Sequence, residues 1–185
     1  LEAIAAERGF ALLHAATLAM PSGEALLLVA PTKGGKSTVA ATLAGRGFAL
    51  HGDNYAFFDG TTVFTVPECR RLGPPRRLSP SFYAKGVNPP PTPCQLPVAS
   101  VVVLAFGEAF CTRPTDAAET AAAMATCYQD SGEGVMADQA QRIESAFLTL
   151  VPALENLHTF RLEMMRDLPR TEAFLEQLVD DQMFG

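Results

Sequence analysis

The sequence predicts an α/β fold in which a phosphate-binding loop joins a buried strand to a helix. Residues 25–30 read Ala-Leu-Leu-Leu-Val-Ala, a continuous apolar run that is typical of a strand buried on both faces. A glycine-containing loop follows, and then good helix formers at 37–44, which end at Gly45 and Gly47. The run at 99–106 is the clearest buried strand. These segments predict an α/β core sheet built around a strand-loop-helix unit.

The remaining segments predict an N-terminal β-hairpin and C-terminal helices. Residues 10–20 form one apolar arm of the hairpin, with its turn at 21–24. Residues 48–50 predict a second strand that returns beside the first and closes a β-loop-α-β unit. Asp59-Gly60 is a strong hairpin signal between two short strands. The other expected elements are strands at 55–58, 61–66 and 157–162, and helices at 115–128, 137–150 and 171–181, the last with Leu175 and Leu178 as core residues.

Length and composition indicate one globular domain that spans residues 1–185. The 185 residues are 48% hydrophobic and 18% charged, which excludes a disordered chain. A net charge of −6 argues against a nucleic-acid partner. No apolar run reaches the length of a membrane span, and no C-x-x-C spacing suggests a zinc site. We therefore expect a cytoplasmic protein with reduced thiols, without membrane attachment.

The charge is unevenly distributed. Residues 33–85 hold eight basic and three acidic side chains, a net charge of +5, so the rest of the chain carries −11. A local cationic zone is what a small polyanionic ligand requires, although a solvated arginine cluster would look the same. Residues 67–97 contain nine of the 14 prolines, which predicts a long loop and not a strand or helix interior.

The loop itself, Ala30-Pro31-Thr32-Lys33-Gly34-Gly35-Lys36-Ser37, matches the P-loop pattern except at its first position, where Ala30 replaces glycine. Successive backbone N–H groups of such a loop form a nest for anionic oxygens, and the helix N-terminus adds positive charge. Gly34 and Gly35 are expected to take positive φ. Lys36 would reach the β- and γ-phosphates and Ser37 would bind Mg²⁺. The predicted nucleotide-binding residues of this segment are Thr32, Lys33, Gly34, Gly35, Lys36, Ser37 and Thr38.

Phosphoryl transfer also requires an acid at a neighbouring strand end. Asp53 follows the strand at 48–50, and its carboxylate should lie at the carboxyl edge of the sheet, near the loop. The strand at 99–106 ends without an aspartate, since Glu108 arrives only after Gly107. A polar turn at Asp53-Asn54 is the simpler alternative.

These segments together resemble the catalytic domain of HPr kinase/phosphorylase. The likeness rests on Leu13-His14, on the P-loop and on residues 46–54, which read Arg-Gly-Phe-Ala-Leu-His-Gly-Asp-Asn. It implies a P-loop kinase-like core sheet, in a fold like that of HPr kinase and phosphoenolpyruvate carboxykinase. It implies Lys36 and Ser37 as phosphate and Mg²⁺ ligands, and Asp53 as the base that takes the proton of the acceptor and as a metal ligand. His14 corresponds to the family histidine near the active site, although a histidine on an apolar strand is more often a core residue.

A further short match, Glu68-Cys69-Arg70-Arg71-Leu72-Gly73, is similar to a family signature whose glutamate assists the metal. The resemblance therefore implies Glu68 as a metal ligand. Arg70, with the neighbouring arginines of the proline-rich loop, would close over the phosphates or the acceptor, because a guanidinium binds phosphate oxygens bidentately.

Departures from the family pattern limit which family properties the resemblance implies for this chain. Asn54 stands where the family has a second aspartate, which removes one charge from the metal site. No segment matches the family's N-terminal domain or its later substrate loop, so HPr itself is not the expected acceptor.

Two functions follow as hypotheses. The first is an ATP- and Mg²⁺-dependent kinase that phosphorylates a serine-type or small-molecule hydroxyl of a protein, peptide or metabolite acceptor. The second is a nucleotide-binding regulatory or accessory module without catalysis, which Ala30 and Asn54 favour. A nucleotide hydrolase that drives motion is disfavoured, because no aspartate ends the strand at 99–106. The choice between ATP and GTP, the acceptor and homo-oligomerisation are left open.

Overall fold

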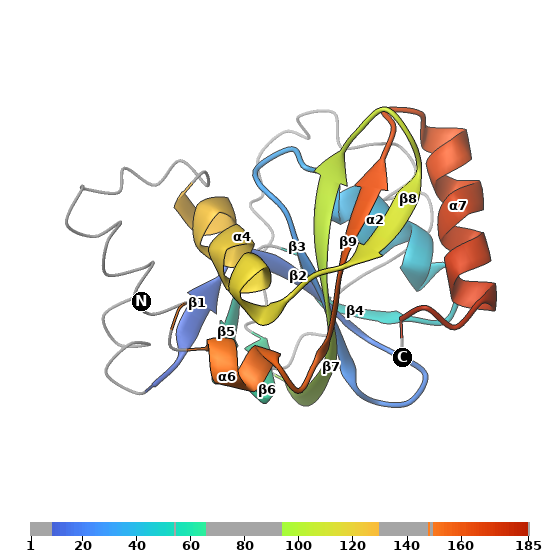
Figure 1. Ribbon diagram of the computed structural model, residues 1–185. Helices are drawn as coiled ribbons and strands as arrows, with labels where there is room; N and C mark the ends of the chain where they lie inside the picture. Colours follow the sequence, from blue (N-terminus) through green and yellow to red (C-terminus); the bar gives the residue numbers. More distant parts are fainter. Residues whose placement is uncertain (1–8, 54, 66–93, 130–147, 149, 185) are drawn as a thin grey trace, which may run out of the picture.

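The computed structural model describes residues 9–53, 55–65, 94–129, 148 and 150–184, and these form an α/β unit around one sheet (Figure 1). The strands in spatial order are β1, β5, β6, β7, β3, β2 and β4, and β9 also pairs with β7 and carries β8 at its other edge. The nine strands of the described residues are β1 (Ala11–Leu13), β2 (Ala15–Ala19), β3 (Ala25–Val29), β4 (Ala49–Gly52), β5 (Ala56–Phe58), β6 (Thr62–Thr65), β7 (Cys94–Phe106), β8 (Cys111–Pro114) and β9 (His158–Met164).

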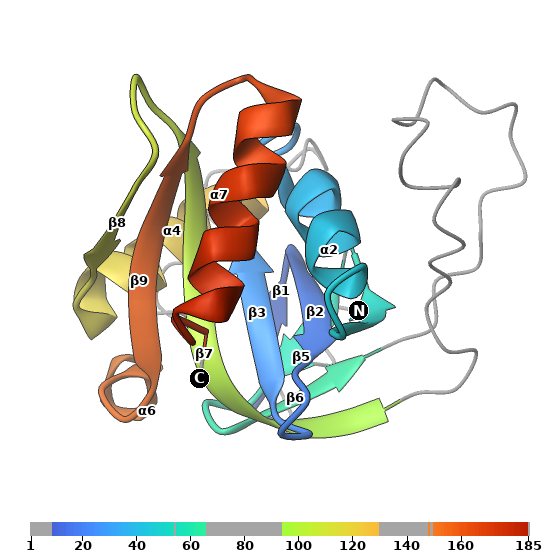
Figure 2. The same cartoon turned by 90° about the vertical axis from the view of Figure 1, so that its right-hand side faces the viewer.

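Helices cover both faces of this sheet. Figure 2 shows α2 (Lys36–Ala44) and α7 (Leu168–Asp180) side by side over one face, while α4 (Ala117–Gln129) lies behind the strands. The short helix α6 (Val151–Leu154) packs against α4. Arg46, just after α2, forms an ion pair with Glu176 of α7. The two helices of the first face are therefore joined at the surface as well as through the core.

Two hydrophobic clusters fill the spaces between the helices and the sheet. Along β3, Leu27 belongs to the cluster under α4, while Leu26 and Leu28 belong to the cluster under α2 and α7. Alternating side chains of a strand point to opposite faces, so a strand covered on both faces must be apolar throughout. All five residues of β3 are buried, which confirms the strand expected from its continuous apolar run.

The N-terminal apolar run does not form a single hairpin arm. It divides at His14 into β1, which pairs with β5, and β2, which pairs with β3 in the expected antiparallel hairpin. His14 therefore lies between two strands and not on the strand that precedes β3. The second predicted hairpin is confirmed, because β5 and β6 pair antiparallel around Asp59-Gly60.

The strand after the P-loop helix does not return beside β3, as the sequence had suggested. β4 pairs with β2, and β3 has β2 and β7 as its neighbours. The hairpin connection to β2 occupies one edge of β3 and β7 occupies the other, so β4 can only add outside β2. The parallel strands β3 and β4 are therefore not in contact, because the hairpin strand β2 lies between them.

The predicted loop at 67–97 is too long at its C-terminal end, because β7 begins at Cys94. Cys94 to Pro97 pair antiparallel with β6, and the pairing with β3 begins only at Val98. Pro97 has no N–H to donate, and a strand tolerates it where a ladder partner lies on one side only. The rest of the loop lies outside the described residues.

The C-terminal elements largely follow the prediction. Helix α4 and strand β9 lie where they were expected, whereas most of the helix predicted at 137–150 lies outside the described residues. Helix α7 begins three residues before the predicted start, since Pro169 occupies its first turn and the Asp167 side chain accepts a hydrogen bond from Arg170 N at 3.2 Å. Leu175 and Leu178 are buried in the core, as predicted. No helix among the described residues is both long and apolar enough to cross a membrane.

Candidate phosphate-binding site

The segment between β3 and α2 is a tight loop that ends at the helix N-terminus. Gly34 N donates a hydrogen bond to Pro31 O at 2.9 Å, and Gly35 is the N-cap of α2. Because the N-cap is a glycine, it supplies no side-chain cap, and no other side chain of the described residues caps this helix end. The first N–H groups of α2 thus lack a side-chain acceptor, which is the arrangement that favours an anion at a helix N-terminus.

Two residues of the loop have left-handed backbone conformations, Lys33 with φ 65° and Gly35 with φ 95°. The sequence predicted positive φ at Gly34 and Gly35, so the assignment of Gly34 is wrong. Gly34 is required for a different reason, because a Cβ there would lie 2.8 Å from both Ala30 Cβ and Pro31 O. The first and fifth positions of the motif therefore lie against each other, and a small residue suits both.

Lys36, at the start of α2, is a buried cation with 7% of its surface exposed. Its Nζ donates to Ala30 O at 2.6 Å and to Pro31 O at 3.5 Å. Burial lowers the pKa of this ammonium below its ordinary value, and the nearby Cys127 and Asp53 oppose that shift. None of the described carboxylates forms an ion pair with it. An anion bound in the loop would compensate the charge that the protein leaves unpaired.

Asp53 lies beside Ser37, and the Ser37 hydroxyl donates to Asp53 Oδ2 at 3.3 Å. A bulge in β4 precedes this carboxylate. Thr17 of β2 is opposite Gly52 and Leu18 is opposite Leu50, so His51 is the extra residue. A bulge bends its strand and changes the direction of the residues that follow it. Here the residues that follow include Asp53, which is directed toward the P-loop. Sequence reasoning placed Asp53 near the loop correctly, although the strand that carries it has a different neighbour.

His14, between β1 and β2, is 8% exposed and also reaches this region. Its Nδ1 donates a hydrogen bond to the backbone oxygen of Cys127 at 3.3 Å, and its ring lies 5.9 Å from that of Tyr55. These contacts hold the ring at the junction of α4 and the phosphate loop.

These residues surround a single hollow of about 340 Å³, here called the phosphate hollow. Phe106, the last residue of β7, is the one lining residue that sequence reasoning did not single out. The available signal was its place at the carboxyl end of the strand next to β3, where ligands of α/β sheets bind. The predicted residues that line the hollow are His14, Thr32, Lys33, Gly34, Gly35, Lys36, Ser37, Thr38 and Asp53. Glu68 and Arg70, and also Asn54, lie outside the described residues.

The site offers few oxygen donors for a divalent cation. Among the described residues no three His, Cys, Asp or Glu side chains gather in one place. Mg²⁺, however, is commonly bound by one or two protein oxygens together with water and substrate phosphates. Ser37 and Asp53 supply a hydroxyl and a carboxylate oxygen within hydrogen-bonding distance of each other, and this donor pair fits Mg²⁺.

Comparison with known proteins adds little to this geometry. No known family profile matches the chain, and no curated protein matches it. The fold is similar to the structure of the HPr(Ser) kinase/phosphatase from Coxiella burnetii, with 12% sequence identity and a TM-score of 0.41. The similarity covers 94% of this chain and 99% of that one. A sequence identity and a TM-score this low say nothing about activity. Membership of the HPr kinase family therefore stays a prediction from the sequence motifs.

Proposed function

We propose that this chain is an ATP-dependent phosphotransferase of the HPr serine kinase kind, which moves the γ-phosphoryl group to a serine-type or small-molecule hydroxyl. One observation carries the proposal. The Ser37 hydroxyl and the Asp53 carboxylate meet at 3.3 Å in the hollow that the buried cation of Lys36 also lines. An anion-binding loop next to a carboxylate is the minimal arrangement for transfer of a phosphoryl group to an alcohol.

Each residue has a role in this proposal. Lys36 exchanges its carbonyl partners, Ala30 and Pro31, for the β- and γ-phosphate oxygens. The loop N–H groups and Thr38 hold the remaining phosphates. Asp53 accepts the proton of the attacking hydroxyl, while His14 contacts the acceptor or the γ-phosphate. Mg²⁺, held by Ser37 and Asp53, would neutralise charge on the phosphates when bound.

The test is transfer from labelled ATP and Mg²⁺ to a cell extract or a peptide mixture. In Asp53→Asn the rate should fall by about 10²- to 10⁴-fold, since general-base catalysis contributes that much. The affinity for ATP, measured without turnover, should survive. Asp180→Asn is the matched control, because Asp180 is exposed at the end of α7 and does not line the hollow. Equal rates for Asp53→Asn and the parent protein would remove the base assignment.

A non-catalytic nucleotide-binding module is the second candidate. It is favoured by Asn54, which leaves Asp53 as the carboxylate that the described part of the chain brings to the loop. A single carboxylate must then serve both the metal and the acceptor proton. Saturable ATP binding without phosphate transfer to any acceptor in the extract would favour this module.

A further inference from the structure

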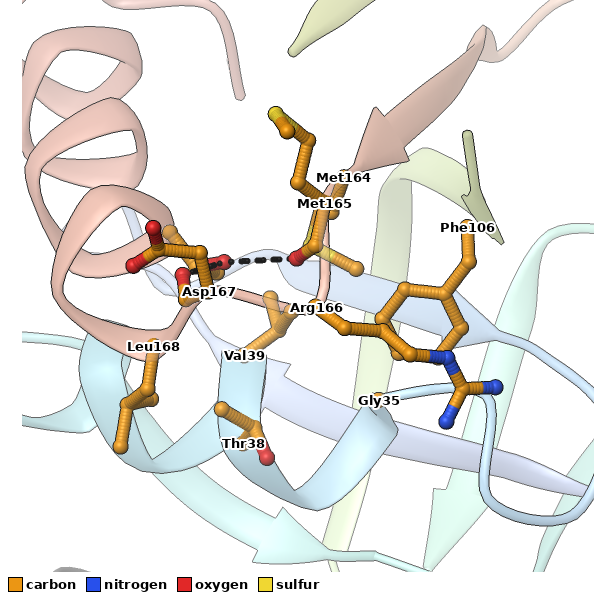
Figure 3. Close-up of a pocket in the computed structure, with 10 residues that line it drawn as sticks. Gly35, Thr38, Val39, Phe106, Met164, Met165, Arg166, Asp167 and Leu168 are labelled. Carbon is orange, nitrogen blue, oxygen red and sulfur yellow. Dashed lines mark hydrogen bonds between the residues drawn. The ribbon is translucent and has the colours of Figure 1, made fainter. Parts of the chain in front are cut away.

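A second hollow, of about 290 Å³, adjoins the phosphate loop on the side of α7. Figure 3 shows side chains from three places converging on it: the first turn of α2, the end of β7, and the segment between β9 and α7. Its walls are mainly apolar, with Phe106, Met164, Met165 and Leu168 among them. The side chains of Arg166 and Asp167 supply charge at its rim.

The exposure of these apolar side chains is unusual for this molecule. Three large hydrophobic residues are exposed among those the structure describes, and two of them, Phe106 (38%) and Leu168 (40%), line this one hollow. The Arg166 guanidinium carbon lies 4.4 Å from the centroid of the Phe106 ring, and Figure 3 shows the arginine side chain crossing the ring. An exposed aromatic ring beside a planar cation is a surface on which a flat, electron-rich group can stack.

The residues that line the second hollow indicate which end of a bound triphosphate it adjoins. It shares Gly35, Thr38 and Phe106 with the phosphate hollow, but Lys36, Ser37 and Asp53 do not line it. In a P-loop the lysine holds the β- and γ-phosphates and the following hydroxyl binds the Mg²⁺ that accompanies them, so the transferring end of a nucleotide lies toward Asp53. Thr38 marks the α-phosphate end. The second hollow therefore continues from the end of the triphosphate to which the nucleoside is attached.

We propose that this hollow binds the nucleoside of the nucleotide, with its base against the Phe106 ring and the Arg166 guanidinium. The inference rests on the proposed function, since it needs phosphates in the adjacent loop. It deepens that function by naming the side chains that distinguish a nucleotide from a bare polyphosphate. Leu168 and Met165 cover the apolar edges of the base and ribose, and Gly35 keeps the passage open. A Cβ on Gly35 would lie 3.3 Å from Met164 Cε and 3.6 Å from Phe106 Cζ.

The experiment compares two probes, ATP and inorganic tripolyphosphate, each with Mg²⁺, by calorimetric titration. The parent protein should bind ATP more tightly, because tripolyphosphate leaves the second hollow empty. Phe106→Ala should weaken ATP binding by about 5- to 100-fold, the range expected for loss of one aromatic stacking partner. Its affinity for tripolyphosphate should fall much less, because Phe106 lines the phosphate hollow without a polar group that could bind phosphate.

Leu148→Ala is the matched control, since Leu148 is the third exposed large apolar residue and lines neither hollow. If Phe106→Ala does not fold, as judged by circular dichroism, Leu168→Ala replaces it. Leu168 is exposed in the first turn of α7 and should give a smaller loss of the same kind.

The outcomes separate this inference from the proposed function. If the parent protein binds tripolyphosphate as tightly as ATP, the nucleoside site is refuted and the phosphate site stands. The same holds if Phe106→Ala weakens both probes equally, because the ring would then serve only the loop. If neither probe binds the parent protein, the phosphate site fails and this inference fails with it.

Discussion

Lys36 is the residue at which stability and binding conflict most directly. Its ammonium is buried against two backbone carbonyls, and burial lowers its pKa. An isolated buried cation destabilises a folded protein unless a counter-charge accompanies it. The loop retains this unfavourable charge in the absence of a ligand, which is understandable if an anion is the intended partner. Functional groups commonly carry such a cost.

The conflict leads to a prediction for Lys36→Met, which keeps the length of the side chain and removes its charge. Without ligand, the free energy of unfolding should rise by about 1–2 kcal/mol, as is common when a functional but destabilising group is replaced. The affinity for tripolyphosphate should fall below detection in the same variant. Urea unfolding and calorimetric titration measure the two effects. Lys33→Met, at an exposed loop position, is the control and should change stability little. A destabilised Lys36→Met that still binds the anion would contradict this view of the residue.

Gly34 supports a second residue-scale prediction. A methyl group there meets the backbone oxygen of Pro31 and the Cβ of buried Ala30, and neither can move away cheaply. Gly34→Ala should therefore distort the loop and weaken tripolyphosphate binding at least tenfold, whereas Ala30→Gly should be tolerated for binding. The calorimetric titration described above measures both. An unchanged affinity in Gly34→Ala would mean that the loop backbone does not set the site.

At the scale of elements, local signals were reliable and strand partners were not. The P-loop helix and the β5–β6 hairpin were predicted because caps, turn residues and apolar periodicity act within a few residues. The pairing of β4 with β2 could not be predicted in this way, since it depends on which edge the N-terminal hairpin occupies. The bulge at His51 was equally inaccessible, because a bulge is defined only by the register of two strands. Phe106 is a different case, since the predicted strand at 99–106 already ended there, and the sequence left out only that this strand is the neighbour of β3.

His51, the extra residue of the β4 bulge, should make the free energy of unfolding depend on pH. Its Nδ1 is buried without a hydrogen-bond partner among the residues that the structure describes, and burial lowers the pKa of the imidazole from its ordinary value of 6.5. Below pH 6.5 the unfolded chain binds a proton that the folded chain resists, so acidification favours unfolding. The stability associated with His51 is therefore full above pH 6.5 and declines as the pH falls from there toward the lower folded-state pKa.

The pH dependence can be measured by urea unfolding at pH 7.5 and pH 5.5. His51→Gln should lose less stability between these two values than the parent protein does, because glutamine does not titrate. His158→Gln is the control, as His158 is an exposed histidine on β9. If the parent protein and His51→Gln respond equally to acid, the imidazole does not resist protonation in the folded state.

At the scale of the whole molecule, the two hollows lie where several parts of the sheet and its helices meet. The phosphate hollow draws on the β3–α2 loop, the residue after β4, the end of β7 and the break between β1 and β2. The second hollow adds the segment between β9 and α7. These contributions come from residues 14 to 171, so none of them recognises a ligand alone. A ligand that bridges both hollows should therefore stabilise the fold as a unit.

This linkage predicts a graded thermal shift. A ligand present at about 100 times its dissociation constant adds about 2.7 kcal/mol to the free energy of unfolding. For a domain of this size, that corresponds to roughly 5–10 °C in the melting temperature. At one fixed concentration, ATP with Mg²⁺ should raise the melting temperature of the parent protein more than tripolyphosphate does. Phe106→Ala should reduce the ATP shift to that of tripolyphosphate, and Lys36→Met should abolish both. An ATP shift that persists in Lys36→Met would place the nucleotide outside the loop, and the proposed function would fail with it.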